Sequence, residues 1–226
     1  MARPQLFLEF LDEYLNLFAS RLTAGSIRFE SNADSADASN ALMFDSNLKA
    51  INYLFKINGG GLLRPDIIQE VARLVDYDVN AKGFRRTNIE VVGSIVKRSE
   101  AKDIYFHIYS LLDNYYHVWP ALDNPYLREA YFHIFFLHIH PFEDGNGRVA
   151  RILTSYNLFK NGEIPFVISA QHKARYVKLI EASDYEGMAM LFKQLADEEK
   201  MVINMLHEKK MTNEAPTFDE KPQPTP

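Results

Sequence analysis

Residues 125–139, PYLREAYFHIFFLHI, are apolar on nearly every side of the helix that their spacing predicts. A helix without a polar face is stable in water only when other elements cover it. This segment therefore predicts a central, buried helix with the rest of the chain packed around it.

Most of the remaining chain has the apolar spacing of amphipathic helices. Residues 64–77 are typical, because Pro65 stands near the start, where a first helical turn tolerates proline. Glycines stop the segment that ends at residue 57. The predicted helical segments are residues 6–22, 41–57, 64–77, 148–162, 172–184 and 186–210.

Residues 83–99 break this helical pattern. The stretch lies between Gly83 and Ser99, and its β-branched residues are Ile89, Val91, Val92, Ile95 and Val96. High β-propensity between turn residues predicts a short β-hairpin. The predicted fold class is therefore all-α, mainly helical, with one short hairpin.

Composition narrows the function classes. The chain has 226 residues, of which 47% are hydrophobic and 24% charged, a balance typical of one soluble globular domain. The absence of cysteine excludes disulfides and thiolate chemistry. A net charge of -5 argues against nucleic acid as the main partner. With no predicted signal peptide or membrane span, we expect a cytoplasmic protein without a membrane partner.

Residues 140–151, HPFEDGNGRVAR, join two predicted helices and concentrate reactive side chains. Gly145, Asn146 and Gly147 can take backbone angles that turn successive N–H groups toward one point at a helix N-terminus. Arg148 and Arg151 are three residues apart and share a helix face. A cluster of backbone N–H groups turned toward one point, beside two guanidinium groups, predicts a polyphosphate site.

The other residues of this stretch suggest catalysis. Asp144 is placed to hold Mg²⁺ against phosphates, since Mg²⁺ usually takes one or two protein carboxylates. His140 is a candidate general base, because an imidazole titrates near neutral pH. Phe142 is predicted to enter the core and Glu143 to face solvent.

Two other kinds of site fit this stretch less well. His133, His138 and His140 suggest zinc, but their spacing does not place three imidazoles on one helix face. The Walker pattern GxxxxGK[ST] is absent, which argues against a P-loop ATPase.

The stretch resembles the HxFx[D/E]GNGRxxR motif of Fic-domain proteins at all eight specified positions. Residues 83–94 look like the family's flap, and residues 175–183 resemble a helix of its adenine pocket, which includes Tyr176. The likeness covers roughly residues 45 to 195. It implies a Fic domain over residues 45–210, after an N-terminal helical region at 1–44 and before a disordered tail at 211–226.

The resemblance also implies an activity. Fic proteins transfer AMP from ATP to a Tyr, Thr or Ser hydroxyl of a target protein. By this resemblance His140 is the base and Asp144 holds Mg²⁺. The implied ATP-binding residues are Gly145, Asn146, Gly147, Arg148, Arg151 and Tyr176. The flap residues implied in target docking are Ile89, Val91, Val92 and Gly93.

Many Fic proteins carry an inhibitory helix with the pattern [S/T]xxxE[G/N]. Ser26 and Glu30 match it, whereas Ser31 departs from it and Asn32 follows one position late. The resemblance implies that Glu30 pairs with Arg151 and keeps that arginine from the γ-phosphate. The same glutamate supports removal of AMP in some family members.

Alternatives to AMP transfer remain open. The loop can also suit transfer of UMP, phosphocholine or phosphate, although Gly147 argues against phosphate transfer. A nucleotide-sensing regulator with negligible catalysis is a different class, and the intact His140 argues against it. Self-modification is compatible with the chemistry, and the apolar N-terminal helices suit a homodimer interface as well as a core.

Overall fold

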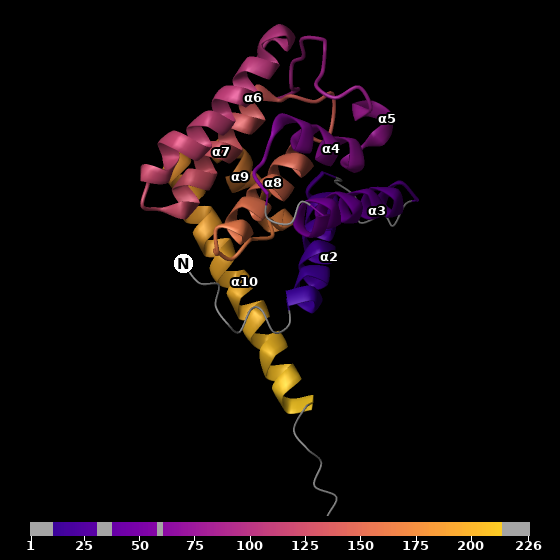
Figure 1. Ribbon diagram of the computed structural model, residues 1–226, viewed down its shortest axis with the longest axis vertical. Coiled ribbons are helices and arrows are strands. Elements are labelled where there is room, and N and C mark those ends of the chain that lie inside the picture. The colour runs from indigo at the N-terminus through magenta and orange to yellow at the C-terminus, as the bar shows by residue number, and fades with distance from the viewer. Residues whose placement is uncertain (1–10, 31–37, 58–60, 214–226) are drawn as a thin grey trace, which may run out of the picture.

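A computed structural model describes residues 11–30, 38–57 and 61–213 (Figure 1). No residue of these ranges lies in a β-strand, which confirms the predicted all-α class. The α-helices are α2 (Leu11–Glu30), α3 (Ala38–Asn52), α4 (Pro65–Val75), α5 (Tyr77–Asn80), α6 (Ile104–Asp113), α7 (Pro125–Ile139), α8 (Asn146–Lys160), α9 (Lys173–Glu181) and α10 (Tyr185–Asn213). Short π or 3-10 turns are η1 (Tyr53–Ile57), η2 (Ala101–Asp103), η3 (Asn114–Val118), η4 (Trp119–Ala121) and η5 (Ala170–His172).

The centre of the molecule is built from α7 and α8, which pack against each other. Helix α7 also contacts α6 and α10, and its Phe132 and Phe136 are fully buried, as the sequence predicted. Helix α8 is more enclosed still, because every residue from Arg148 to Phe159 is buried (Figure 1). The arginines that follow the motif loop therefore lie in the interior.

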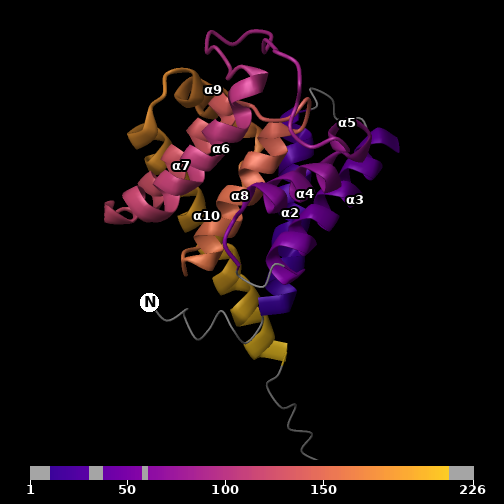
Figure 2. The ribbon, with the colours of Figure 1, turned by 45° about the horizontal axis from the view of Figure 1, so that its top comes forward.

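The N-terminal helix α2 belongs to the same core and is longer than predicted. It packs against α3 and continues to Glu30. It is also tied to α10, because Arg21 donates to both carboxylate oxygens of the buried Glu199 at 2.6 Å. Tyr14 donates to the same carboxylate at 3.3 Å, and the two helices lie close together (Figure 2). One end of α2 is therefore fixed to the body of the protein.

The predicted β-hairpin is not formed. Residues 81–100 are an irregular loop with a turn in which Ser94 N–H donates to the Val91 carbonyl at 3.0 Å. Gly93, inside this turn, has φ +81°, which favours glycine. Backbone groups that would pair in a hairpin bond to side chains instead. Arg85 donates to the carbonyls of Thr87 and Ser99, and Glu181 accepts from the Ile95 N–H.

Helix α6 has no counterpart among the predicted segments. Its buried residues have helical spacing: Ile104, Ile108, Leu111 and Leu112. The opposite face is also apolar, because Tyr105, Phe106 and Tyr109 are exposed there. Hydrophobic residues on both faces obscured the stripe by which a surface helix is recognised.

The predicted segment boundaries differ from the helix ends. Helix α3 crosses the expected limit between residues 44 and 45, and α10 runs into the expected tail as far as Asn213. Residues 214–226 lie outside the described ranges. Within the described ranges, no helix combines the length and hydrophobicity needed to cross a bilayer.

Glu129 is a carboxyl group buried in the core between α7 and α8. It accepts from Tyr115 at 2.5 Å and from Asn157 at 3.1 Å, yet burial raises its pKa to about 7. A carboxyl with a raised folded pKa stabilises the fold fully below its ordinary pKa. This contribution is lost as pH rises through the folded value.

We therefore expect the free energy of unfolding of the wild type to fall, relative to Glu129→Gln, as pH rises from 5 to 8. The relative loss should approach about 3 kcal/mol, at about 1.4 kcal/mol per pKa unit. Urea unfolding of both proteins across this range measures the difference. The exposed Glu186→Gln serves as the control, and parallel stability curves for wild type and Glu129→Gln would contradict the expectation.

Candidate active site

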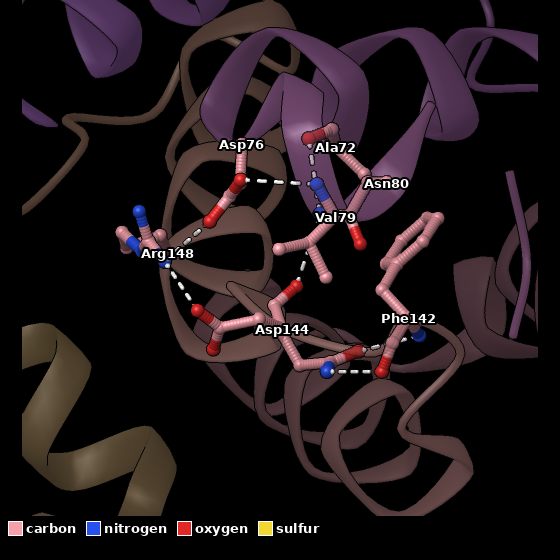
Figure 3. A network of polar contacts seen from close by, with 8 residues as sticks. Ala72, Asp76, Val79, Asn80, Phe142, Asp144 and Arg148 are labelled. Carbon is pink, nitrogen blue, oxygen red and sulfur yellow. Dashed lines mark hydrogen bonds and ion pairs between the residues drawn. The ribbon is translucent and has the colours of Figure 1, made fainter. Parts of the chain in front are cut away.

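The loop between α7 and α8 is closed by the side chain of Asn146. Its Nδ2 donates to the Phe142 carbonyl at 2.8 Å, and its Oδ1 accepts from the Phe142 N–H at 3.0 Å (Figure 3). Phe142 is fully buried, as predicted. The amide of Asn146 therefore shapes the loop, and what it offers a phosphate is its backbone N–H.

Two further contacts fix the loop where α8 begins. Gly145 has φ +75°, and a Cβ there would approach Val75 to 3.1 Å, so conformation and space both favour glycine. Asn80 donates from Nδ2 to the Asp144 carbonyl at 3.1 Å and to the Ala72 carbonyl at 3.2 Å (Figure 3). Helices α4 and α5 thus support the loop from behind.

The N-terminus of α8 is an electropositive end. No side chain caps Gly145, and a first helical turn leaves backbone N–H groups without intrahelical partners. Arg148 lies beside it with a side chain only 5% exposed, its Nη2 3.2 Å from Asp144 Oδ2 and 3.9 Å from Asp76 Oδ2. These contacts orient the guanidinium before any ligand arrives (Figure 3).

Asp144 and its neighbour Glu143 are both exposed carboxylates of the loop. The Asp144 side chain is 63% exposed and contacts Arg148. Among the described residues no three His, Cys, Asp or Glu side chains gather as a metal site. An exposed carboxylate beside an anion-binding helix end, as Asp144 is through Arg148, fits Mg²⁺ held jointly with phosphate oxygens.

His140 ends α7 in a left-handed conformation, with φ 52° and ψ 61°. This conformation is costly for a side chain other than glycine, by about 1–3 kcal/mol, so the surroundings must hold it. The His140 N–H donates to the Phe136 carbonyl at 3.0 Å, and its own carbonyl accepts from Arg85 Nε at 2.7 Å. Burial and the nearby Arg98 guanidinium lower the pKa of His140 to about 4. The imidazole is therefore neutral at physiological pH.

Arg85 organises this corner and was not identified from the sequence. Its guanidinium donates to the carbonyls of Thr87 at 2.6 Å, Ser99 at 2.5 Å and Ile139 at 3.3 Å, besides that of His140. It therefore ties both ends of the 81–100 loop to the end of α7. A lone arginine in a loop carries no sequence signal for this role, which depends on tertiary contacts.

Arg151 points from α8 toward the N-terminal helix. It is 1% exposed, and its Nε donates to the hydroxyl of the buried Ser26 at 3.0 Å. Glu30 is the last residue of α2, one turn beyond Ser26, and its side chain lies outside the described part of the structure. Of the two predicted inhibitory residues, Ser26 thus contacts the second arginine of the motif.

Comparison with known proteins agrees with this geometry. The Fic/DOC family model matches residues 62–158, which include the whole motif loop. The chain contains a Fic domain. A crystal structure of a Fic domain-containing signaling protein from Bacteroides thetaiotaomicron has the same fold, with a TM-score of 0.66 and 19% identity. That likeness covers 88% of this chain and 85% of the other.

Two further comparisons involve animal Fic proteins. Fic-1 from C. elegans superposes with a TM-score of 0.67 at 16% identity, covering 95% of this chain and 68% of that one. The protein adenylyltransferase Fic of Aedes aegypti is 25% identical over 166 residues, which are 72% of this chain. The matched region spans 33% of the length of that relative.

Tyr176 of α9 lies in the core. Its side chain is 2% exposed, and its hydroxyl is 2.6 Å from His133 Nε2, while His133 Nδ1 is 2.8 Å from Thr154 Oγ1. Burial and the Arg151 charge lower the pKa of His133 to about 3, so this imidazole is neutral. In this conformation the Tyr176 ring has no surface for a nucleotide, and it packs α9 onto α7.

The predicted docking residues lie on the 81–100 loop of the Fic domain. Val92 and Gly93 are exposed at the turn, and Ile89 and Val91 are half-buried. Glu181 of α9 holds this turn, accepting from Ser94 Oγ at 2.7 Å and from Ile95 N–H at 3.0 Å. The loop therefore stands next to His140 through Arg85 and next to α9 through Glu181.

Proposed function

We propose that this chain transfers AMP from ATP to a hydroxyl side chain of a target protein. The observation that carries the proposal is the convergence at one loop of a neutral histidine, a helix N-terminus and two buried arginines. A protein with only a phosphate site would have no use for a neutral imidazole held in a costly backbone conformation beside it.

The phosphate half of the site acts by charge. The amides at the start of α8 receive the phosphates next to the transferred group. Arg148 and Arg151 compensate the charge that develops on the pyrophosphate as it leaves. Arg148 is already oriented by Asp76 and Asp144, so little reorganisation accompanies the reaction.

The histidine half acts on the incoming hydroxyl. The Tyr, Thr or Ser oxygen attacks the α-phosphorus, its proton passes to the neutral imidazole of His140, and pyrophosphate departs on the opposite side. Arg85 fixes the carbonyl of His140 and thereby the position of the ring. The 81–100 loop, which begins and ends near His140, is the proposed docking surface for the target segment.

Asp144 is the proposed Mg²⁺ ligand, and the cation would supply further neutralisation of the phosphates. We expect Asp144→Ala to abolish transfer and to weaken Mg²⁺-dependent ATP binding by about tenfold or more. Calorimetry with ATP, with and without Mg²⁺, measures this. Glu143→Ala is the matched control, since Glu143 is an exposed neighbouring carboxylate. Loss of Mg²⁺ dependence in the control alone would move the ligand to Glu143.

Helix α2 is proposed to inhibit the site. Ser26 already contacts Arg151, and a residue four positions further lies on the same face of a helix. We propose that Glu30 pairs with Arg151 and competes with the γ-phosphate. Removal of AMP from a modified target by the same glutamate is part of this proposal.

The test of the proposed function compares nucleotide donors. The protein is incubated with labelled ATP, UTP, GTP and CDP-choline, and modification of itself and of lysate proteins is measured, with mass spectrometry to identify the added group. The proposal expects AMP on a hydroxyl side chain. Addition of UMP, phosphocholine or phosphate would contradict AMP transfer and assign a different transferred group. Nucleotide binding without any transfer would favour a nucleotide sensor.

A further inference from the structure

We propose that Glu181, the last residue of α9, is a positioning residue for the target protein. It holds the exposed turn of the 81–100 loop in place, so that an incoming target segment meets a preformed surface. The turn includes Val92 and Gly93, two of the predicted docking residues, and both are exposed. This inference rests on the proposed function, because it gives a role in target binding to a residue outside the motif loop.

Residues 86–99 have little regular structure of their own. They contain no helix or strand, and the bond from the Ser94 N–H to the Val91 carbonyl is the one backbone–backbone hydrogen bond that the structure describes within them. A segment with few such bonds opens at little cost, and ordering it on binding weakens the affinity for a partner. Arg85 fixes the ends of the segment to α7. Its middle must therefore be held by another group.

Glu181 supplies the bonds at the middle of this segment. Its Oε1 accepts from Ser94 Oγ at 2.7 Å, and its Oε2 accepts from the Ile95 N–H at 3.0 Å. Ser94 Oγ accepts in turn from Arg98 Nη2 at 2.7 Å and from the Val96 N–H at 3.2 Å. The hydroxyl thus donates once and accepts twice, which is its full bonding capacity. Both oxygens of one carboxylate therefore fix one turn, through bonds that its charge strengthens.

Helix α9 is a firm support for the turn, because it is bonded to α7 at two places. The Tyr176 hydroxyl is 2.6 Å from His133 Nε2, and the Ile180 carbonyl is 3.1 Å from His138 Nε2. His138 stands two residues before His140 in the sequence. Through α9, the turn is therefore attached to the same end of α7 that carries the proposed base.

The place of Glu181 in its own helix is not explained by the stability of that helix. A carboxylate in the last turn faces the negative end of the helix dipole, where cations are favoured. The cation near it, Arg98 at 3.8 Å, belongs to the loop and not to α9. Both of its hydrogen bonds also go to the loop. Glu181 therefore stabilises the loop rather than the helix on which it lies.

Hydrogen exchange tests the hold on the turn and needs no activity. Full-length wild type and Glu181→Ala are compared by mass spectrometry of peptides that cover the turn. We expect the amides of residues 94–96 to exchange about tenfold faster or more in the variant, because two bonds to a carboxylate are lost. The matched control is Glu186→Ala, an exposed glutamate five residues further on, which should leave the turn unchanged. Unchanged exchange of the turn in Glu181→Ala would overturn the proposal.

Peptides from α9 show whether the helix itself survives the substitution. Their exchange should equal that of the wild type. If it rises as well, Glu181→Gln takes the place of the alanine variant, since it keeps the shape of the side chain and one acceptor oxygen. A smaller rise, confined to the turn, is then expected, and no rise in the turn would again overturn the proposal.

A transfer assay tests whether the held turn serves the target. The enzyme carries Glu30→Gly, the change expected to release the proposed inhibition, and the acceptor is a tagged copy of the chain with His140→Ala and an intact Glu181. We expect Glu181→Ala in the enzyme to raise the KM for the acceptor by about tenfold, with kcat and ATP affinity changed by less than about twofold. A fall in kcat at unchanged KM, or no change in either, would overturn the proposal. No transfer by the enzyme with intact Glu181 would contradict the proposed function instead, and hydrogen exchange would still decide whether Glu181 holds the turn.

Discussion

Replacing His140 with alanine is expected to lower AMP transfer by about 10²–10⁴-fold, while ATP affinity changes by less than about twofold. The reason is a separation of roles within one loop. In the proposed mechanism the start of α8 and the arginines bind the phosphates, whereas the imidazole at the end of α7 acts on the nucleophile. Calorimetry gives the affinity, and incorporation of labelled AMP gives the rate.

The control for this change is His117→Ala, because His117 is an exposed histidine whose side chain contacts Asp113. It should keep full activity. If His140→Ala lost ATP affinity in proportion to its activity, His140 would be a phosphate ligand and the assignment of a base would fail.

The pKa of His140 adds a second measurement on the wild type. A free imidazole base would lose activity as pH falls through about 6.5. Because burial and Arg98 lower the pKa of His140 to about 4, the neutral form persists to lower pH. We expect the transfer rate at saturating ATP to show no loss with a midpoint near 6.5. A midpoint near 6.5 that disappears in His140→Ala would show that the histidine titrates normally.

The motif loop was predictable because its chemistry is local. A glycine at position 145 indicates a left-handed turn, and the residues that follow it begin a helix. An anion site can therefore be inferred from this short stretch alone. Phe142 was correctly placed in the core for the same reason, since a lone aromatic residue in a polar loop needs an apolar neighbour. For this loop, local rules were sufficient.

The hairpin prediction was wrong because bonds to side chains replaced the ladder. β-branched residues predict strands only when the backbone groups pair across the turn. Here Arg85, which lies inside the predicted hairpin, donates to the Thr87 carbonyl, and Glu181 of α9 accepts from the Ile95 N–H. The burial of Tyr176 also depends on a distant partner, because its hydroxyl lies beside His133, which is far away in the sequence.

The burial of α8 could not be read from its composition. Its sequence contains two arginines, which ordinarily mark a surface helix. Arg151 is nevertheless 1% exposed, because Ser26 of α2 meets it in the interior. A buried arginine needs partners, and these come from a distant helix that only the fold brings into place.

That contact motivates the second large expected effect. Glu30→Gly is expected to raise AMP transfer, including self-modification, by more than about tenfold over a weak wild type. Arg151 can bond a carboxylate of α2 or the γ-phosphate, but not fully both. Because α2 is also anchored to α10 through Arg21 and Glu199, we expect it to keep its position when ATP binds. Labelled-ATP assays on wild type and variant measure the change.

Two serines of α2 provide a matched comparison for this mechanism. Ser26→Ala removes the hydroxyl that accepts from Arg151 Nε and is expected to activate by a few-fold, since one hydrogen bond contributes about 1 kcal/mol. Ser20→Ala removes a hydroxyl bonded only to the Asn16 carbonyl of the same helix among the described contacts, and should leave activity unchanged. If α2 inhibits by bonding Arg151 directly, Ser26→Ala should raise activity and Ser20→Ala should not, although both remove one hydroxyl from the same helix.

Arg151→Ala tests whether α2 inhibits the site through this arginine. The variant should be inactive both alone and combined with Glu30→Gly, because it removes the group for which helix and phosphate compete. Activation of Arg151→Ala by Glu30→Gly would mean that α2 blocks the site by its bulk rather than through this arginine. Equal activity in wild type and Glu30→Gly would show that the Ser26 contact only stabilises the fold, and that the departure at Ser31 marks a chain without this inhibition.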